Sequence, residues 1–291
     1  MESFKLAIAA VAAGICAQSA LAEMRENGAE VTVQDLGEIT VHSYSAPQEM
    51  FADTTYIIES ENALVLIDGQ MFVPFASDYR AYADSLGKPI DRVILTHGHP
   101  DHYLGLFAFA DLPIHAPAAT IAEITETGEE TRAARAEMMG DVIPDRVTIP
   151  GVAIEPGTQV IDGVTYDFSL LNGGEHDPML ITRLPDHGVI SVGDVAMNEM
   201  HLFLAGNPDT WAEALRALAA EDGYDVVLPG HGLPGGPSMY ATNISYLETA
   251  SELMGQTEDA DTFRAGMVEA FPDLGMVAAL DFFLPYLFPE N

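Results

Sequence analysis

The densest group of potential metal ligands in this sequence is Leu95-Thr96-His97-Gly98-His99-Pro100-Asp101-His102. It continues the apolar run that begins at Val93, which is typical of a buried strand. The polar cluster is therefore predicted to lie where a strand ends and the chain turns. Three imidazoles and one carboxylate fall within six residues, and such nitrogen and oxygen donors suit a first-row metal such as zinc. The spacing predicts a metal-binding loop.

Three later segments each supply one more side chain able to bind a metal: His176, Asp194 and His231. Each follows a predicted apolar strand and has small residues beside it, which allow the backbone to turn tightly. Carboxyl ends of strands are where open α/β sheets usually place their sites. One such residue alone would be weak evidence, but four segments of the same kind predict a single metal centre at one edge of the fold.

The order of predicted elements is that of an α/β protein, with no internal repeat. Strands are expected at 31–33, 39–44, 54–59, 63–67, 92–95, 113–115, 147–149, 152–154, 159–161, 165–171, 179–184, 189–192 and 225–228. Helices are expected at 77–86, 103–110 and 118–139, after the N-cap Asn207, and two or three times within 238–291.

The N-terminus is typical of a secretory signal peptide, because an apolar run is followed by Ala20-Leu21-Ala22, an A-x-A cleavage pattern. We therefore expect a signal peptide at 1–22, one α/β domain at 23–237, and a helical extension at 238–291 packed on that domain. The expected location is periplasmic or extracellular, without stable membrane insertion after cleavage. The only cysteine, Cys16, lies in the signal segment, so a metal in the mature chain would be held by His, Asp or Glu.

The charge balance is strongly acidic, with 45 acidic against 11 basic residues and a net charge of −34. This argues against nucleic acid and anionic membranes as partners, since both require basic patches. It also disfavours strongly anionic substrates unless a metal site reverses the local field. The expected partner is a small molecule, and nothing in the pattern indicates the oligomeric state.

The series H-x-H-x-D-H, His176, Gly193-Asp194 and Gly230-His231-Gly232 resembles the metallo-β-lactamase-fold hydrolases, over roughly residues 30–235. The resemblance implies a four-layer αβ/βα sandwich with two zinc ions at one edge between the sheets. It assigns the first metal to His97, His99 and His176, the second to Asp101, His102 and His231, and the bridging position to Asp194. Iron or manganese would fit the same donors.

The resemblance also implies a mechanism. Seven ligands for two metals leave room for a bridging water, which two Lewis acids would deprotonate near neutral pH. That hydroxide would attack the carbonyl, while Asp101 orients it and carries the proton to the leaving group. The predicted function is therefore an exported dinuclear zinc hydrolase of esters, thioesters or lactones.

Two departures from the family pattern leave alternatives open. Asp194 stands where β-lactamases of this fold usually carry Cys or Ser, and is similar to the glyoxalase II, lactonase and quinoprotein-relay branches. Gly174-Glu175-His176-Asp177 replaces the common Gly-His-Thr-x-Gly motif. An iron-dependent oxidoreductase, a true β-lactamase and a non-catalytic periplasmic metal-binding protein remain the alternatives.

Further residues are predicted around the centre. His201, Asn198 and Tyr103 are expected to contact the substrate, and Asp68, at a strand end, is expected to accept a hydrogen bond from a ligand histidine. Segments 118–145 and 238–291 carry no recognisable motif and are expected to form part of what selects the substrate.

Overall fold

The computed structural model describes residues 21–289. The predicted signal peptide lies outside the described residues except for Leu21 and Ala22, which belong to the first strand. Within the described part of the chain, no helix is both long and apolar enough to cross a membrane.

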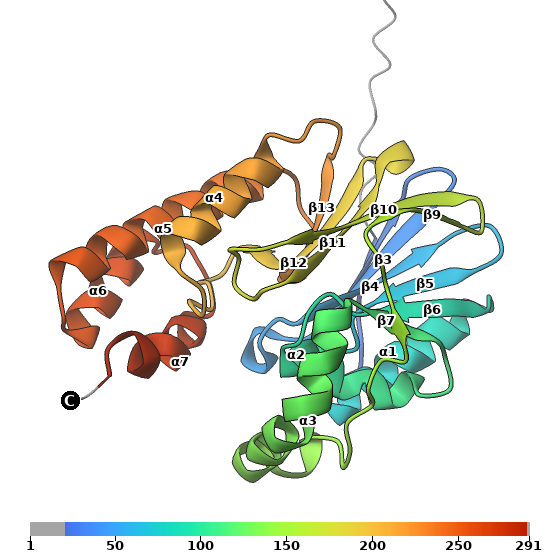
Figure 1. Cartoon of the computed structure of the whole chain (residues 1–291), viewed down its shortest axis with the longest axis horizontal. Coiled ribbons are helices and arrows are strands. Elements are labelled where there is room, and N and C mark those ends of the chain that lie inside the picture. The colour runs from blue at the N-terminus through green and yellow to red at the C-terminus, as the bar shows by residue number, and fades with distance from the viewer. Residues whose placement is uncertain (1–20, 290–291) are drawn as a thin grey trace, which may run out of the picture.

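Two β-sheets lie face to face, and helices cover the outer face of each (Figure 1). This is the predicted αβ/βα sandwich. The first sheet follows chain order, and its strands are β1 (Leu21–Met24), β2 (Glu30–Asp35), β3 (Thr40–Ser45), β4 (Thr54–Glu59), β5 (Leu64–Ile67), β6 (Ile90–Ile94), β7 (Ile114–Ala116) and β8 (Val152–Ala153). The second sheet has the order β13 (Val226–His231), β12 (Val189–Met197), β11 (Met179–Leu184), β10 (Val164–Leu171) and β9 (Gly157–Ile161).

The helices are divided between the two outer faces. Those near the first sheet are α1 (Val73–Ser85), α2 (Pro100–Tyr103) and α3 (Ala118–Met139), and those near the second are α4 (Pro208–Ala219), α5 (Ser238–Gln256), α6 (Ala260–Ala270) and α7 (Val277–Leu287). Short 3-10 turns occupy Gln48–Met50, Leu104–Phe109, Gly140–Val142 and Pro185–His187. The helices expected in the C-terminal segment are α5 to α7.

The core between the sheets follows from the side-chain alternation of the strands. Ile58 and Ile67 of the first sheet are fully buried in the same apolar cluster as Leu180 and Leu184 of the second. Burying apolar surface of this kind stabilises the fold by roughly 25 cal/mol per Å². The paired sheets therefore form a rigid support for the loops at their shared edge.

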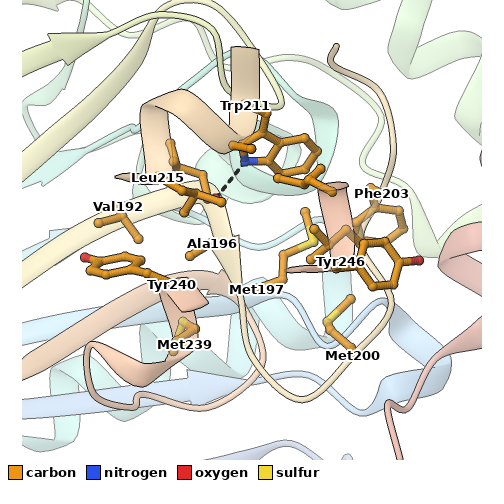
Figure 2. Close-up of a cluster of buried hydrophobic side chains, with 14 of the residues drawn as sticks. Val192, Ala196, Met197, Met200, Phe203, Trp211, Leu215, Met239, Tyr240 and Tyr246 are labelled. Atoms are coloured by element: carbon orange, nitrogen blue, oxygen red, sulfur yellow. Dashed lines mark hydrogen bonds between the residues drawn. The ribbon is translucent and has the colours of Figure 1, made fainter. Parts of the chain in front are cut away.

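A second core holds β12 against α4 and α5, and Trp211 lies within it (Figure 2). Trp211 is fully buried, and its indole Nε1 donates a hydrogen bond of 2.8 Å to the carbonyl of Val195. Helix α4 begins as predicted, since the Asn207 side chain accepts hydrogen bonds from the first-turn N–H groups of Asp209 and Thr210. This packing fixes the part of β12 that carries Asp194.

Several boundaries differ from the sequence expectation. No strand forms at 147–149, because the Val147 N–H donates instead to a carboxylate oxygen of Glu129 on α3. Helix α1 begins at Val73, before the expected start, with Pro74 in its first turn. The expected helix at 103–110 is a short α-helix at Pro100–Tyr103 followed by a 3-10 segment. Strand β1 and the extension of β12 to Met197 were not anticipated.

Candidate metal centre

Five strand ends and loops of the two sheets meet at one edge of the sandwich and carry the candidate residues. Asp68 follows β5, the 96–102 loop follows β6, and Glu175 and His176 follow β10. Asp194 lies within β12 at an irregularity in its pairing with β13, which itself ends at His231. The predicted convergence of the four motif segments is present.

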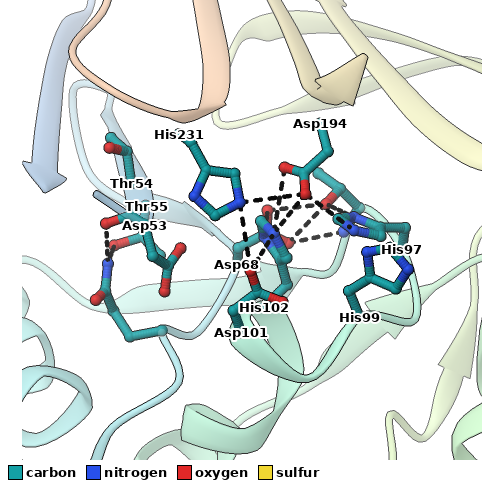
Figure 3. Close-up of polar contacts among 12 residues, drawn as sticks. Asp53, Thr54, Thr55, Asp68, His97, His99, Asp101, His102, Asp194 and His231 are labelled. Atoms are coloured by element: carbon teal, nitrogen blue, oxygen red, sulfur yellow. Dashed lines mark hydrogen bonds and ion pairs between the residues drawn. The ribbon is translucent and has the colours of Figure 1, made fainter. Parts of the chain in front are cut away.

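Asp194 belongs to two groups of potential ligands, each with its donor atoms within 4.8 Å of one another. One group is His97, His99, Glu175 and Asp194, and the other is Asp101, His102, Asp194 and His231. Figure 3 shows the imidazoles of His97, His102 and His231 turned toward the Asp194 carboxylate. Both groups share this carboxylate, and its role as a bridging ligand stays a prediction.

The imidazoles lie close enough to Asp194 for a cation to bind among them. Asp194 Oδ2 lies 3.5 Å from Nε2 of His97 and 3.2 Å from Nε2 of His231. Nε2 of His102 lies 3.2 Å from Asp194 Oδ1, and Nε2 of His231 lies 3.3 Å from Oδ2 of Asp101. Gly230 is needed here, because a Cβ at this position would stand 1.7 Å from Asp194 Oδ1.

Three histidines are oriented by hydrogen bonds from their other ring nitrogen. Nδ1 of His102 donates to Asp68 at 3.0 Å, as predicted, and Nδ1 of His231 donates to the Phe51 carbonyl at 2.8 Å. Nδ1 of His97 lies 3.0 Å from the Thr96 hydroxyl, which donates to Asp68 at 2.8 Å. A proton held on Nδ1 leaves Nε2 unprotonated and directed at the cluster, which is the form that binds a metal.

The backbone of Asp68 is unusual as well. Its φ is 63°, in the left-handed region that side chains other than glycine seldom adopt. The carboxylate also accepts the Thr96 N–H at 2.8 Å. Such a conformation is found where several contacts hold it in place, and functional sites are common among these.

Buried charge at this edge is strongly negative. Carboxylates gather here from Asp53, Asp68, Asp101, Glu175 and Asp194. Within residues 21–289, no lysine or arginine forms an ion pair with any of them. Because burying uncompensated carboxylates is costly, the site requires protons or bound cations. Divalent cations fit this requirement and the chemistry of the donors.

The pKa values follow from this charge distribution. Burial and the neighbouring His102 lower the pKa of His97 well below its usual 6.5, so this ring is neutral, as a ligand must be. Burial opposes ionisation of Asp194, but the imidazoles of His102 and His231 hold the pKa of its carboxyl well below 3.8. Burial alone would lower the pKa of His102, yet Asp194 and Asp68 raise it well above 6.5. The carboxylates of Asp194 and Asp68 therefore favour positive charge at this edge of the sheets.

The structure places His176 beside the first ligand group and Glu175 within it. Oε2 of Glu175 lies 2.9 Å from Nδ1 of His99, whereas Nε2 of His176 donates to Glu123 of α3 at 3.0 Å. The centroid of the His176 ring still lies 4.6 Å from that of His99, and its buried Nδ1 has no hydrogen-bond partner in the described part of the chain. The assignment of His176 as a ligand stays a prediction, and Glu175 is a competing ligand that the sequence did not indicate.

Asp53 is a second buried acid that sequence reasoning missed. The residue is 1% exposed, and no group among residues 21–289 donates a hydrogen bond to either carboxylate oxygen. Asp53 forms an isolated β-bridge with His231, which brings it beside the second ligand group (Figure 3). Burial, the largest influence, raises the pKa of Asp53 well above 3.8. Only the long-range pairing of the loop before β4 with β13 reveals this neighbour.

An open hollow of about 560 Å³ lies over the centre, which we call the site hollow. Its polar part consists of His99, Asp101, Glu175 and Asp194. The rest of its lining is apolar apart from one arginine, and the residues are Phe51, Met71, Pro100, Arg135, Met139, Phe203, Phe282 and Phe283. Helices α3 and α7 supply four of these, so both segments without a sequence motif form part of the site.

The three predicted substrate contacts are placed elsewhere, and none is among the residues that line the site hollow. His201 is buried, and its Nδ1 lies 3.0 Å from the Tyr246 hydroxyl of α5. The Asn198 side chain donates to the Leu233 carbonyl at 2.9 Å. Tyr103, the last residue of α2, is 2% exposed because it packs in an apolar cluster with residues of the first sheet and α1. The expectation that these three residues contact the substrate stays a prediction.

Comparison with known proteins agrees with this geometry. Residues 51–231 match the family model of the metallo-beta-lactamase superfamily. A stretch of 67 residues is 34% identical to the uncharacterized protein YobT of Bacillus subtilis, which covers 23% of this chain and 28% of that relative.

Solved structures share the fold at low sequence identity. A metallo-beta-lactamase from Pontibacter korlensis superposes with a TM-score of 0.60 at 17% identity, covering 75% of this chain and 99% of its own. One from Hirschia baltica gives 0.54 at 22% identity, covering 75% and 97%. A double mutant of the sec-alkyl sulfatase PisA1 gives 0.60 at 20% identity, covering 92% of this chain and 50% of its own.

Proposed function

Because the chain belongs to the metallo-beta-lactamase superfamily, we propose that it is a hydrolase that uses two zinc ions to cleave an ester, a thioester or a lactone. The observation that carries this proposal is the Asp194 carboxylate shared by two groups of ligand atoms. A carboxylate shared in this way suits two ions held side by side.

The ligand atoms divide between the two ions. His97, His99 and Glu175 would hold the first, Asp101, His102 and His231 the second, and Asp194 both. We prefer Glu175 to His176 at the first position, since a carboxylate oxygen of Glu175 belongs to this group of ligand atoms and no atom of His176 does. When bound, the ions would supply Lewis acidity that activates a water and polarises the carbonyl.

Residues of the chain would transfer the proton and exclude other water. Asp101 faces the site hollow with a side chain that is 17% exposed, and His231 holds its Oδ2 at 3.3 Å. We propose that Asp101 accepts a proton from the attacking water and returns it to the leaving oxygen or sulfur. Water then adds to the acyl carbon, the bond to the leaving group breaks, and the products are an acid and an alcohol or thiol. The apolar lining of the hollow would exclude other water.

The test is a panel of aryl esters, thioesters, lactones, a cephalosporin and a secondary alkyl sulfate, assayed with zinc-loaded protein. The sulfate is included because one structural neighbour is named a sec-alkyl sulfatase. We expect turnover of an acyl substrate, its loss in His99→Ala and Asp194→Ala, and near wild-type activity in the turn variant His187→Ala. Full activity in either site variant, with folding checked by circular dichroism, would contradict the proposal. β-Lactam turnover as the main activity would favour a β-lactamase instead.

A second candidate function, iron-dependent oxidation, is supported by the composition of the first ligand group. Two histidines and two carboxylates, His97, His99, Glu175 and Asp194, resemble the donor sets that iron accepts. Stoichiometric iron in protein from its native source, together with substrate-dependent oxygen uptake, would favour this candidate over the zinc hydrolase.

We also propose that the protein is exported, on the basis of the signal-like N-terminus. Fractionation of the native cells, followed by N-terminal sequencing, should find a mature chain that begins at Glu23 outside the cytoplasm. An uncleaved cytoplasmic chain would contradict this proposal.

A further inference from the structure

One cation lines the site hollow, and within residues 21–289 it forms no ion pair with an acidic side chain. Of the ten basic residues in the described part of the chain, eight form an ion pair with a carboxylate, whereas Arg135 and Arg146 form none. Arg135 lines the hollow, and Arg146 does not. In a chain with 45 acidic residues, an unpaired guanidinium beside the metal centre calls for an explanation.

The surroundings of Arg135 present it to the hollow rather than to the protein. Its guanidinium carbon lies 5.5 Å from the centre of the Phe282 ring of α7, a cation–π contact that leaves the planar edge with its N–H groups available. Among residues 21–289, none accepts a side-chain hydrogen bond from Arg135. Five donors in a fixed fork match a carboxylate or a similar oxyanion.

The remaining lining is apolar. Phe51 and Phe203 stand in edge-to-face contact, and Phe203 in turn contacts Phe283 of α7. Met71 and Met139 complete this wall, and methionine side chains adapt to flexible apolar chains. An apolar wall combined with one unpaired guanidinium suits a molecule that is apolar along most of its length and carries an anionic group.

We propose that the substrate is an amphiphilic acyl ester or thioester that carries a carboxylate apart from the scissile bond, and that Arg135 binds this carboxylate. This inference rests on the proposed hydrolase function and names its substrate class. The acidic floor of the hollow does not oppose it, since two bound divalent ions would offset the charges of Asp101, Glu175 and Asp194. It also gives a role to helices α3 and α7, which bring Arg135 and Phe282 together.

The experiment compares two aryl esters on zinc-loaded protein. Para-nitrophenyl hexanoate has a neutral acyl chain, and the para-nitrophenyl monoester of adipic acid has a chain of the same carbon number that ends in a carboxylate. We expect wild type to prefer the adipate, and Arg135→Gln to lower kcat/KM for adipate about 10- to 100-fold through KM, with hexanoate changed less than about twofold. Arg135→Lys should fall in between, because it keeps the charge and loses the fork.

The matched control is Arg146→Gln, which removes the other unpaired arginine and should leave both esters unchanged. Equal losses on both esters in Arg135→Gln would mean that Arg135 only supports α7, and no loss on either would mean that it binds no substrate anion. Both results overturn the proposal. Glutamine keeps good helix propensity at this position in α3, so the fold should be retained.

A binding measurement separates this inference from the hydrolase proposal. By calorimetry on zinc-loaded protein, octanoate should bind at least about tenfold tighter than octanol, and Arg135→Gln should remove most of that preference. If neither ester is hydrolysed but this preference is found, the anion site stands and the hydrolase proposal fails. If esters are hydrolysed without any preference for the anion, the hydrolase stands and this inference fails.

Discussion

Replacing Asp68 with asparagine tests whether hydrogen bonds behind the ligands prepare the centre for metal. The change keeps the size and shape of the side chain, and asparagine tolerates the backbone φ of 63° that Asp68 adopts. Asp68 accepts the Thr96 N–H at 2.8 Å, the Thr96 hydroxyl at 2.8 Å and Nδ1–H of His102 at 3.0 Å. An amide has only one oxygen for these three donors.

The substitution sets two hydrogen-bond donors against each other. If the amide oxygen faces the Thr96 N–H, the amide NH₂ faces Nδ1–H of His102, so two donors oppose each other. The ring must turn away or move its proton to Nε2, the atom that faces Asp194 and Asp101. Loss of such a supporting contact costs about 10- to 100-fold in metal affinity, or about 1.4–2.8 kcal/mol.

The assay is an equilibrium titration of metal-free protein with zinc, in competition with a chromophoric chelator of known affinity. Asp162→Asn is the matched control, because Asp162 also has a positive φ, 44°, and accepts hydrogen bonds from Ser60 and from the Asn62 N–H. Its zinc affinity should equal that of wild type within about twofold. Wild-type affinity in Asp68→Asn, or a loss no larger than in Asp162→Asn, would refute the reasoning.

Other variants test the ligand set, the core and the acid response. Glu175→Gln should lower metal content by one ion per chain while His176→Gln retains both, measured by elemental mass spectrometry; the opposite pattern would restore His176 as the ligand. Trp211→Ala should lower the free energy of unfolding by about 3–5 kcal/mol, followed by circular dichroism in urea, because it leaves a cavity and an unpaired Val195 carbonyl; a cost below about 1 kcal/mol would contradict the proposed support of β12. Burial lowers the pKa of His42 from 6.5, so the unfolded chain takes up a proton that the folded chain resists. The contribution of this histidine is therefore fully present above pH 6.5 and is lost as the pH falls below it, and His42→Gln should make the unfolding free energy less dependent on pH in that range; an unchanged slope would contradict this.

The sequence anticipated those parts of the centre that local pattern controls. The histidines of the 96–102 loop come directly after an apolar strand, so their position at a sheet edge could be predicted from the order of residues in the chain. Helix α3 has the predicted bounds, Ala118–Met139, and the two sheets with their outer helices form the expected sandwich. Asp68 was also predicted to accept a hydrogen bond from a ligand histidine, because it closes a strand near the site, and the structure identifies that histidine as His102.

The residues that were not predicted reach the site through contacts between distant parts of the chain, which a local sequence pattern does not show. Whether Glu175 or His176 faces the first ligand group is set by the backbone of a loop in which Gly173 has a φ of 85°. The departure from the family motif at these two residues was the only signal. Arg135 reaches the site hollow because α3 and α7 meet across it, although they are far apart in the chain. Asp53 becomes a neighbour of the centre through its bridge to His231.

The measurement that tests the account most directly is the zinc stoichiometry of the purified mature protein. The protein is dialysed to remove loosely bound ions, and zinc per chain is determined by elemental mass spectrometry, in wild type and in Asp194→Asn. We predict close to two zinc ions per wild-type chain and a clear loss in the variant, since Asp194 is shared by both ligand groups. A wild-type chain that retains no divalent metal even after reconstitution with excess zinc would contradict the account.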